Sequence, residues 1–104
     1  MSEDFESGGR WFEWNQGKAT MNREKHGVDF REAATTFDAR HAVEAPQLIG
    51  DEERWLIIAM SARGRILAST YTYRGKRIRL ISSRPANRRE RNEYFQGRWR
   101  RHLR

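Results

Sequence analysis

The sequence of 104 residues contains no cysteine. A disulfide framework, a thiolate zinc site and a cysteine nucleophile are therefore all excluded. The three histidines (His26, His41 and His102) are scattered along the chain, and this spacing does not make a metal site. We expect any activity to use oxygen, nitrogen and charged groups, with no metal and no cofactor.

Long apolar runs are also missing. No stretch approaches the roughly 20 residues that a membrane span requires. Residues 1–10 are acidic and contain glycine, unlike the basic and apolar regions of a signal peptide. We therefore expect a cytoplasmic protein with no membrane partner, built as a flexible acidic tail (1–10), a single domain (11–95) and a basic C-terminal tail (96–104).

The charge is divided unevenly along the chain. The formal net charge is +7, with −6 on residues 1–53 and +13 on residues 54–104. A surface with this density of cations favours a polyanion as partner, and nucleic acid is the first candidate. Arginine outnumbers lysine 18 to 3. That ratio suits bidentate phosphate binding, but a GC-rich genome would produce it equally well.

The first half of the domain predicts a strand followed by two helices. The aromatic run at 11–14 indicates a strand that buries one face. Asn15 and Gly27 are typical of the two ends of a helix, here over residues 16–26. Apolar residues at helical spacing over 30–37, after a capping aspartate, predict a second helix.

The second half predicts a β-meander. A short strand at 42–45 comes first, and three β-rich runs separated by Arg-Gly turn signals follow at 54–62, 65–73 and 76–84. Pro85 ends the last strand because it cannot donate to a ladder, and residues 86–95 read as a charged helix. The order of elements predicts an α+β fold.

Alternation along the strands predicts which residues leave the core. Ile78 and Leu80 share one face of the third run, so Arg77 and Arg79 point to the other. Ile81 falls on the same face as the two arginines. A twist, a bulge or a covering helix must account for an apolar side chain there.

The same alternation makes a polar aromatic surface feasible on the second run, where Arg65, Tyr71 and Tyr73 share parity. A sheet face with arginines and tyrosines offers phosphate contacts and stacking surfaces, as single-stranded RNA requires. The alternative is an ordinary solvated sheet face.

Several short motifs follow one another along the chain between Trp11 and Phe95. They are Phe12-Glu13-Trp14-Asn15 followed by Lys18, Ala19 and Asn22; Lys25-His26-Gly27-Val28 with Phe30, Glu32 and Ala33; Glu53-Arg54-Trp55; Gly64-Arg65; and Tyr71-Thr72 through Arg74-Gly75, Ile78-Arg79, Ile81-Ser82, Arg84, Ala86, Glu90 and Tyr94. Together they resemble the BrnT toxins of BrnT/BrnA type II toxin–antitoxin modules. The chain departs from that family in its acidic start, in the loop from His41 to Gly50 and in its basic extension after Tyr94.

The resemblance implies a RelE/ParE-like fold. With the predicted elements, this gives an antiparallel β-meander sheet with two N-terminal helices on one face and a C-terminal helix. The resemblance also implies a ribonuclease that halts translation, and a BrnA-like antitoxin that silences it in a toxin–antitoxin hetero-oligomer. Promoter DNA would be bound only through the antitoxin. The alternatives are a non-catalytic module that binds RNA or antitoxin, and a ParE-like gyrase inhibitor.

Metal-independent RNA cleavage requires a base for the ribose 2′-hydroxyl, cations for the phosphorane and an acid for the leaving oxygen. We assign Arg79 and Arg65 to phosphate and transition-state binding, and His26 and Glu53 to proton transfer. The expected RNA-binding residues are Lys25, Arg54, Tyr71, Tyr73, Arg74 and Arg84.

Several of these residues also have an ordinary structural role open to them. His26 can satisfy the last carbonyls of a helix, and Glu53 can be part of an ion-paired strand entry. Arg84, near a strand end, can anchor the last helix. The two tyrosines can be plain strand aromatics.

Overall fold

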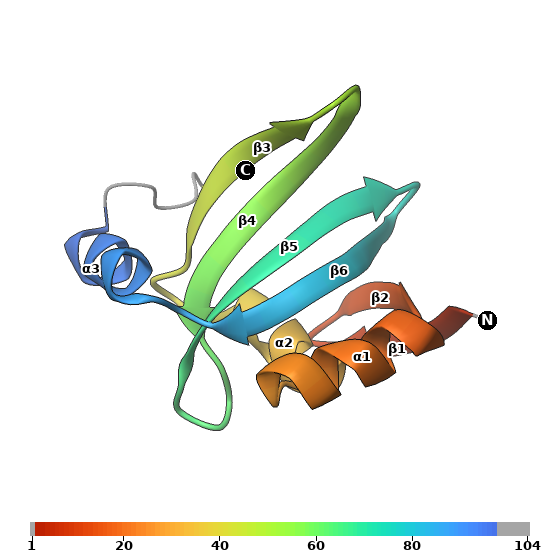
Figure 1. Ribbon diagram of the computed structural model, residues 1–104, viewed down its shortest axis with the longest axis horizontal. Coiled ribbons are helices and arrows are strands. Elements are labelled where there is room, and N and C mark those ends of the chain that lie inside the picture. Colours follow the sequence, from red (N-terminus) through yellow and green to blue (C-terminus); the bar gives the residue numbers. More distant parts are fainter. Residues whose placement is uncertain (1, 98–104) are drawn as a thin grey trace.

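The computed structural model of the protein describes residues 2–97 and holds one six-stranded sheet with the strand order β1-β2-β6-β5-β4-β3 (Figure 1). The elements are β1 (Ser2–Ser7), β2 (Arg10–Asn15), α1 (Gln16–His26), α2 (Phe30–Thr35), the 3-10 turn η1 (Thr36–Asp38), β3 (Val43–Ile49), β4 (Glu52–Met60), β5 (Ile66–Arg74), β6 (Arg77–Pro85) and α3 (Arg88–Gln96). The α+β class predicted from the sequence is confirmed. None of the described helices is long and apolar enough to cross a membrane.

The predicted ends of the first helix are confirmed. The side chain of Asn15 accepts a hydrogen bond from the backbone N–H of Lys18 at 3.0 Å. Gly27 follows the helix with φ at +68°, a left-handed conformation that glycine adopts without a steric penalty. Asp29 caps α2 through the backbone N–H of Arg31. The second helix is shorter than predicted, because its last turn tightens into η1.

The predicted β-meander is confirmed over β4 to β6, and β3, which is longer than the short strand predicted at 42–45, joins it. Every neighbouring pair from β3 to β6 is antiparallel. The sheet as a whole is not antiparallel, however, because β2 pairs with β6 in parallel through Phe12 with Ile78 and Glu13 with Arg79. The chain leaves β2, passes through α1, α2 and the meander, and returns beside β2 in the same direction. Such a long-range pairing leaves no mark in local sequence.

The expectation of a flexible tail at residues 1–10 is wrong. Residues 2–7 form β1, which pairs along its whole length with β2. Phe5 packs on Trp14 with ring centroids 5.8 Å apart. Asp4 lies 2.8 Å from Arg77, and Glu3 pairs with Arg31. The strand is held by cations from two other elements, α2 and β6, which its own composition does not reveal.

Ile81 is explained by a β-bulge. Thr70 pairs with Ser82 whereas the next residue, Tyr71, pairs with Leu80, so Ile81 is the extra residue. The bulge shifts the alternation of β6 by one position. Ser83 therefore returns to the core, where it is fully buried and its hydroxyl lies 2.7 Å from that of Ser69.

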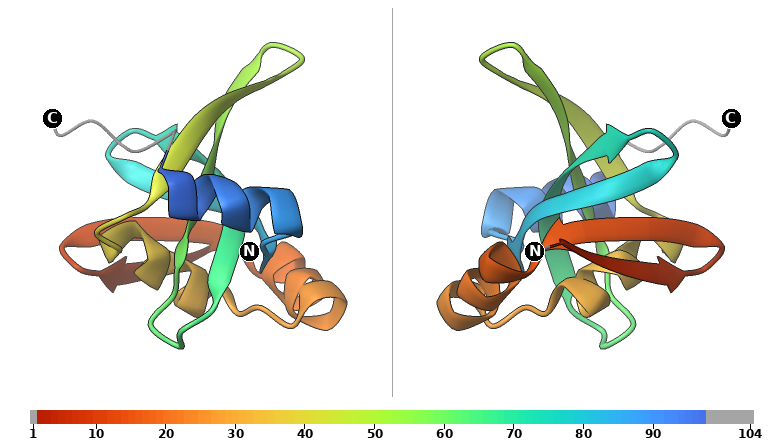
Figure 2. Two further views of the ribbon diagram at one scale, coloured as in Figure 1. Left: turned by 90° about the vertical axis from the view of Figure 1, so that its left-hand side faces the viewer. Right: turned by 90° about the vertical axis from the view of Figure 1, so that its right-hand side faces the viewer.

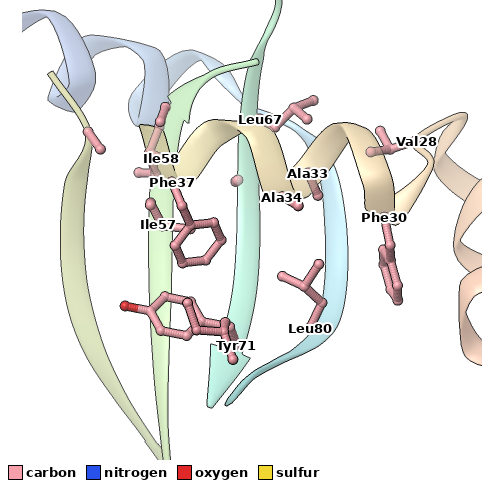
Figure 3. Close-up of a cluster of buried hydrophobic side chains, with 14 of the residues drawn as sticks. Val28, Phe30, Ala33, Ala34, Phe37, Ile57, Ile58, Leu67, Tyr71 and Leu80 are labelled. Carbon is pink, nitrogen blue, oxygen red and sulfur yellow. The ribbon is translucent and has the colours of Figure 1, made fainter. Parts of the chain in front are cut away.

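Helices cover both faces of the sheet. The face toward α1 and α2 carries most of the core (Figure 3), including Phe12, Trp14, Ile57, Leu67, Tyr71 and Leu80. We call this the helix face. On the opposite face Ile58 and Ala68 are also buried, and α3 contacts β4. Figure 2 shows α3 crossing the sheet on the side away from α1. No helix within residues 2–97 lies over the remainder of this second face, and we call it the open face.

The predicted last helix is present as Arg88–Gln96, with an N-terminal capping box between Asn87 and Glu90. Of the predicted basic tail at 96–104, residues 98–104 lie outside the part of the chain that the structure describes.

Candidate functional site

One polar row crosses the open face, with one residue from each strand. Direct strand partners join Asp4, Glu13, Arg79 and Thr72 in that order. Arg54 lies beside Thr72, because the next residue, Trp55, pairs with Tyr71, and Gln47 pairs with Arg54. We call these six residues the cross-strand row. Directly opposite residues share a face, so all six side chains are on the open face.

Two of the predicted RNA-contacting arginines are brought together by this row. Arg79 and Arg54 flank Thr72 on adjacent strands, which places their Cα atoms about 10 Å apart at the usual strand spacing. The hydroxyl of Thr72 donates to the carbonyl of Glu53 at 2.8 Å. The structure therefore creates a pair of guanidinium groups from residues 25 positions apart in the sequence.

The arginines of the open face are paired with carboxylates. Arg79 donates to Glu13 at 2.6 Å, and both side chains are largely buried, at 18% and 16% exposure. Arg54 donates twice to Glu52, at 3.0 and 2.7 Å. A phosphate must share each of these guanidinium groups with a carboxylate, so the face is less cationic than the sequence suggests.

Arg77 extends the open face beyond the row. Its guanidinium lies 2.8 Å from Asp4 and 5.5 Å from the ring centre of Trp11, which is half exposed. Arg74, opposite Arg77 at the end of β5, is exposed. Among residues 2–97 no carboxylate pairs with Arg74, so it is a cation available to an approaching anion.

Arg84 is placed where it anchors α3. Its guanidinium makes two hydrogen bonds to Glu90, at 2.6 and 2.9 Å. Burial disfavours the charged carboxylate of Glu90, but the bonds from Arg84 and from the backbone of Asn87 outweigh it, so its pKa is lowered. Of the two roles open to Arg84 in the sequence, this geometry supports the structural one.

Arg65 does not join Arg54 and Arg79, contrary to the expected gathering of the three. It donates to the carboxylate of Glu32 at 2.8 and 2.6 Å and to the carbonyl of Gly27 at 2.8 Å. Ser61 donates to the same carboxylate at 2.7 Å. The hydrogen bond from Arg65 is the main reason that the pKa of Glu32 is lowered. This cluster ties α2 to the β4–β5 turn, at the far end of β5 from Thr72.

Lys25 and His26 lie in the last turn of α1. This helix lies along the edge of β6, where the side chain of Asn22 bonds both the N–H and the C=O of Ser83, four residues beyond Arg79. Lys25 and His26 immediately precede Gly27, whose carbonyl accepts from Arg65, and so lie toward the Arg65 end of the sheet. The candidate proton-transfer residue His26 does not share a site with Arg79.

The tyrosines and Glu53 also belong to the helix face. Tyr71 is buried, with its ring 4.9 Å from that of Phe37 (Figure 3), and its hydroxyl donates to Glu44. Burial, followed by this hydrogen bond, raises the pKa of Tyr71 well above its usual range. Tyr73 is 52% exposed beside it. The predicted stacking surface and the predicted arginine surface are thus on opposite sides of one sheet.

Four residues of the row were not selected as site residues in the sequence analysis: Asp4, Glu13, Thr72 and Gln47. Glu13 alternates with the buried Phe12 and Trp14, so strand parity alone already points it away from the core. Its position beside Arg79 depends on the parallel pairing of β2 with β6, for which the sequence carries no signal.

No group of three or more His, Cys, Asp and Glu side chains within residues 2–97 is arranged to hold a metal ion. The polar groups gathered on the open face are guanidinium, carboxylate, hydroxyl and amide. Such a set can bind a phosphodiester and can accept a proton from a hydroxyl.

An RNA-cleaving toxin is the class that this fold and surface fit. A family model described as "Ribonuclease toxin, BrnT, of type II toxin-antitoxin system" matches residues 14–90. The chain therefore belongs to the BrnT family of ribonuclease toxins of type II toxin–antitoxin systems, as its motifs predict.

A solved structure supports this assignment. The chain is similar to the crystal structure of the Brucella abortus ribonuclease toxin, BrnT, with 26% identity and a TM-score of 0.58, over 72% of this chain and 94% of that one. No curated protein gives a significant match. The family match begins at Trp14, so β1 and most of β2 precede it.

Proposed function

We propose that this protein is a metal-independent endoribonuclease that binds its RNA backbone on the open face of the sheet. The supporting observation is the cross-strand row, in which Arg79 and Arg54 flank Thr72 on the part of the sheet that none of the described helices covers. Guanidinium groups bind phosphate in a bidentate manner and stabilise the charge that develops on the phosphorane. Arg79 is the central phosphate-binding residue in this proposal.

We also propose that the protein has the RelE/ParE-like fold. The antiparallel meander, with two helices before it and one after it, fits the RelE/ParE-like arrangement implied by the resemblance. Cleavage of translated RNA would halt translation in the cytoplasm. The partner that silences the toxin is a BrnA-like antitoxin, which would also carry the complex to promoter DNA.

The charge distribution supports an acidic antitoxin surface. Residues 54–104 carry a formal charge of +13, and α3 exposes Arg88 and Arg89 beside the open face. A complementary acidic helix would bind quickly and block RNA by covering the same cations. We expect the tight toxin–antitoxin complex to be inactive on RNA.

Cleavage of a defined RNA at low salt in the presence of EDTA tests the proposal. We expect wild-type protein to cleave, and Arg79→Ala to lose about 100-fold or more of the rate, as when one transition-state donor is removed. Arg23→Ala is the matched control, since Arg23 lies on α1 with its side chain 56% exposed and its deletion changes the net charge equally.

Other outcomes select other functions. Intact RNA with retained binding would identify a non-catalytic module. Inhibition of gyrase supercoiling without RNA loss would identify a ParE-like inhibitor. Cleavage that stops in EDTA and returns with a divalent cation would overturn metal independence.

A further inference from the structure

The open face needs a proton acceptor, and the residues predicted for that role are elsewhere. His26 lies on α1, and Glu53 alternates with Arg54 and so points to the helix face. RNA cleavage by the neighbouring 2′-hydroxyl requires a base near the bound phosphate. The residue must therefore come from the open face itself.

Four carboxylates of the described chain share the open face with these arginines outside α3. Asp4 is 56% exposed and pairs with Arg77, and Glu52 is 46% exposed and pairs with Arg54. Glu6, the strand partner of Trp11, is also exposed. Glu13 differs from all three, because its side chain is only 16% exposed and it is the direct strand partner of Arg79. A largely buried carboxylate beside the main phosphate-binding group is better placed for catalysis than an exposed one.

The contacts of Glu13 leave one of its oxygens available. Its Oε2 accepts from the NH1 group of Arg79 at 2.6 Å. Within residues 2–97 no hydrogen bond reaches Oε1. Arg79 in turn has five N–H donors, and only one of them is used in this bond. A single Glu13–Arg79 pair can therefore bind a phosphate through the guanidinium and a ribose hydroxyl through the free carboxylate oxygen.

We propose that Glu13 is the general base of this ribonuclease, a catalytic residue that accepts the 2′-hydroxyl proton while Arg79 holds the adjacent phosphate. The inference rests on the proposed function. In this step the proton moves from the ribose oxygen to Oε1, the O2′–P bond forms, and the P–O5′ bond breaks. The 5′-oxygen takes a proton from water, and the proton on Glu13 neutralises the hydroxide that this leaves, which restores the carboxylate. The products are a 2′,3′-cyclic phosphate and a 5′-hydroxyl.

The charged groups that face Glu13 come from both neighbouring strands. Arg79 lies on β6, and Asp4 lies on β1 with the guanidinium of Arg77 2.8 Å away. Glu6, also on β1, lies diagonally across from Glu13 on the same face. On its own strand the adjacent open-face side chains are Trp11 and Asn15, which are uncharged. Protonation of Glu13 at low pH removes the base, so the rate of cleavage must fall on the acid side of its profile.

The test compares Glu13→Gln with wild type on a short RNA of known cleavage position. Glutamine keeps the shape and one acceptor for Arg79 but cannot take the proton. We expect kcat to fall about 100-fold or more, the usual contribution of a general base, with KM within about twofold and the acid limb of the pH profile abolished. Glu13→Asp should retain more activity than Glu13→Gln. Glu24→Gln, on the exposed side of α1, is the control and should leave kcat unchanged.

Several results would overturn the inference. They are a Glu13→Gln enzyme within about threefold of wild type, a raised KM at unchanged kcat, and a wild-type profile with no acid limb. The last measurement needs no variant, so it can refute the inference even if Glu13→Gln fails to fold. A wild-type protein that leaves RNA intact would instead refute the proposed function. Cleavage that is lost in Arg79→Ala but kept in Glu13→Gln would refute only the role of Glu13.

Discussion

Arg65 provides the sharpest test of the distinction between a structural and a catalytic arginine. The side chain of Glu32 is only 5% exposed, and Arg65→Gln would leave its carboxylate with Ser61 as its one close donor. Removing one partner of a buried ion pair costs about 3–5 kcal/mol. We expect about 3 kcal/mol, the low end, because Arg65 is 36% exposed and Arg63 can approach from 3.9 Å. The melting temperature should fall by roughly 12 °C or more.

The double variant Glu32→Gln/Arg65→Gln separates stability from catalysis. Two neutral amides replace the ion pair, so no buried charge remains unpaired, and about 1–2 kcal/mol of the loss should return. Urea denaturation followed by circular dichroism measures the free energy of unfolding of each variant. RNA cleavage is then measured at a temperature where all of them are folded, and the double variant should cleave near the wild-type rate.

Two results would refute this reasoning. A folded double variant without activity would show that Arg65 contacts the RNA. A change of less than about 1 kcal/mol in Arg65→Gln would show that the pair does not support the fold. Arg10→Gln is the control, because the ion pair of Arg10 with Asp38 is exposed at 39% and 47% and should contribute under about 1 kcal/mol.

Three further predictions follow from the buried polar groups. Asn22→Ala should cost about 2–4 kcal/mol in thermal denaturation, because it leaves the N–H and C=O of Ser83 and the C=O of Val28 without their partner. Glu32 and Glu90 both have lowered pKa values in the folded protein, so their stabilisation is complete above the ordinary value of 4.5 and is lost as the pH falls through the lowered values. The urea midpoint should therefore stay level from about pH 7 to 5 and then decrease. Tyr71→Phe should lose about 1 kcal/mol with the hydrogen bond to Glu44 and keep the wild-type rate of RNA cleavage.

Each of the three has a contrary outcome, and the first also has a matched control. Asn92→Ala changes an exposed asparagine of α3 and should shift stability by less than about 0.5 kcal/mol; an equal loss in Asn22→Ala would contradict the buried role. A urea midpoint that rises as the pH falls below 4.5 would contradict the sign of the Glu32 and Glu90 effects. Loss of cleavage in a stable Tyr71→Phe protein would place its hydroxyl in the site.

Local features of the fold were predictable because short-range physics determines them. Asn15 and Gly27 specify the ends of α1 through caps that involve residues three or four positions away. The Arg-Gly pairs specify the turns of the meander, and Gly75, with φ at +61°, occupies a conformation that glycine readily adopts. Strand parity correctly placed Arg79 opposite the buried Ile78 and Leu80.

The same parity misplaced the surface of the second run. Arg65, Tyr71 and Tyr73 share one face, but that face is the one covered in part by α1 and α2. Parity tells which residues lie together and not which side a helix will cover, since both faces of β5 contain apolar and polar residues. The bulge at Ile81 added a change of parity that only the register of β5 and β6 revealed.

The sequence by itself determined the class of the fold, the extents of most elements and, through ordered motifs, the family. Tertiary structure alone decided the site. It brought β2 beside β6, so that Glu13 meets Arg79, and it directed Arg65 to Glu32 and Arg84 to Glu90. Caps, turns and alternation depend on neighbours a few residues away, whereas an ion pair depends on which distant strands meet. The partners of each arginine are therefore set by the packing of the whole chain.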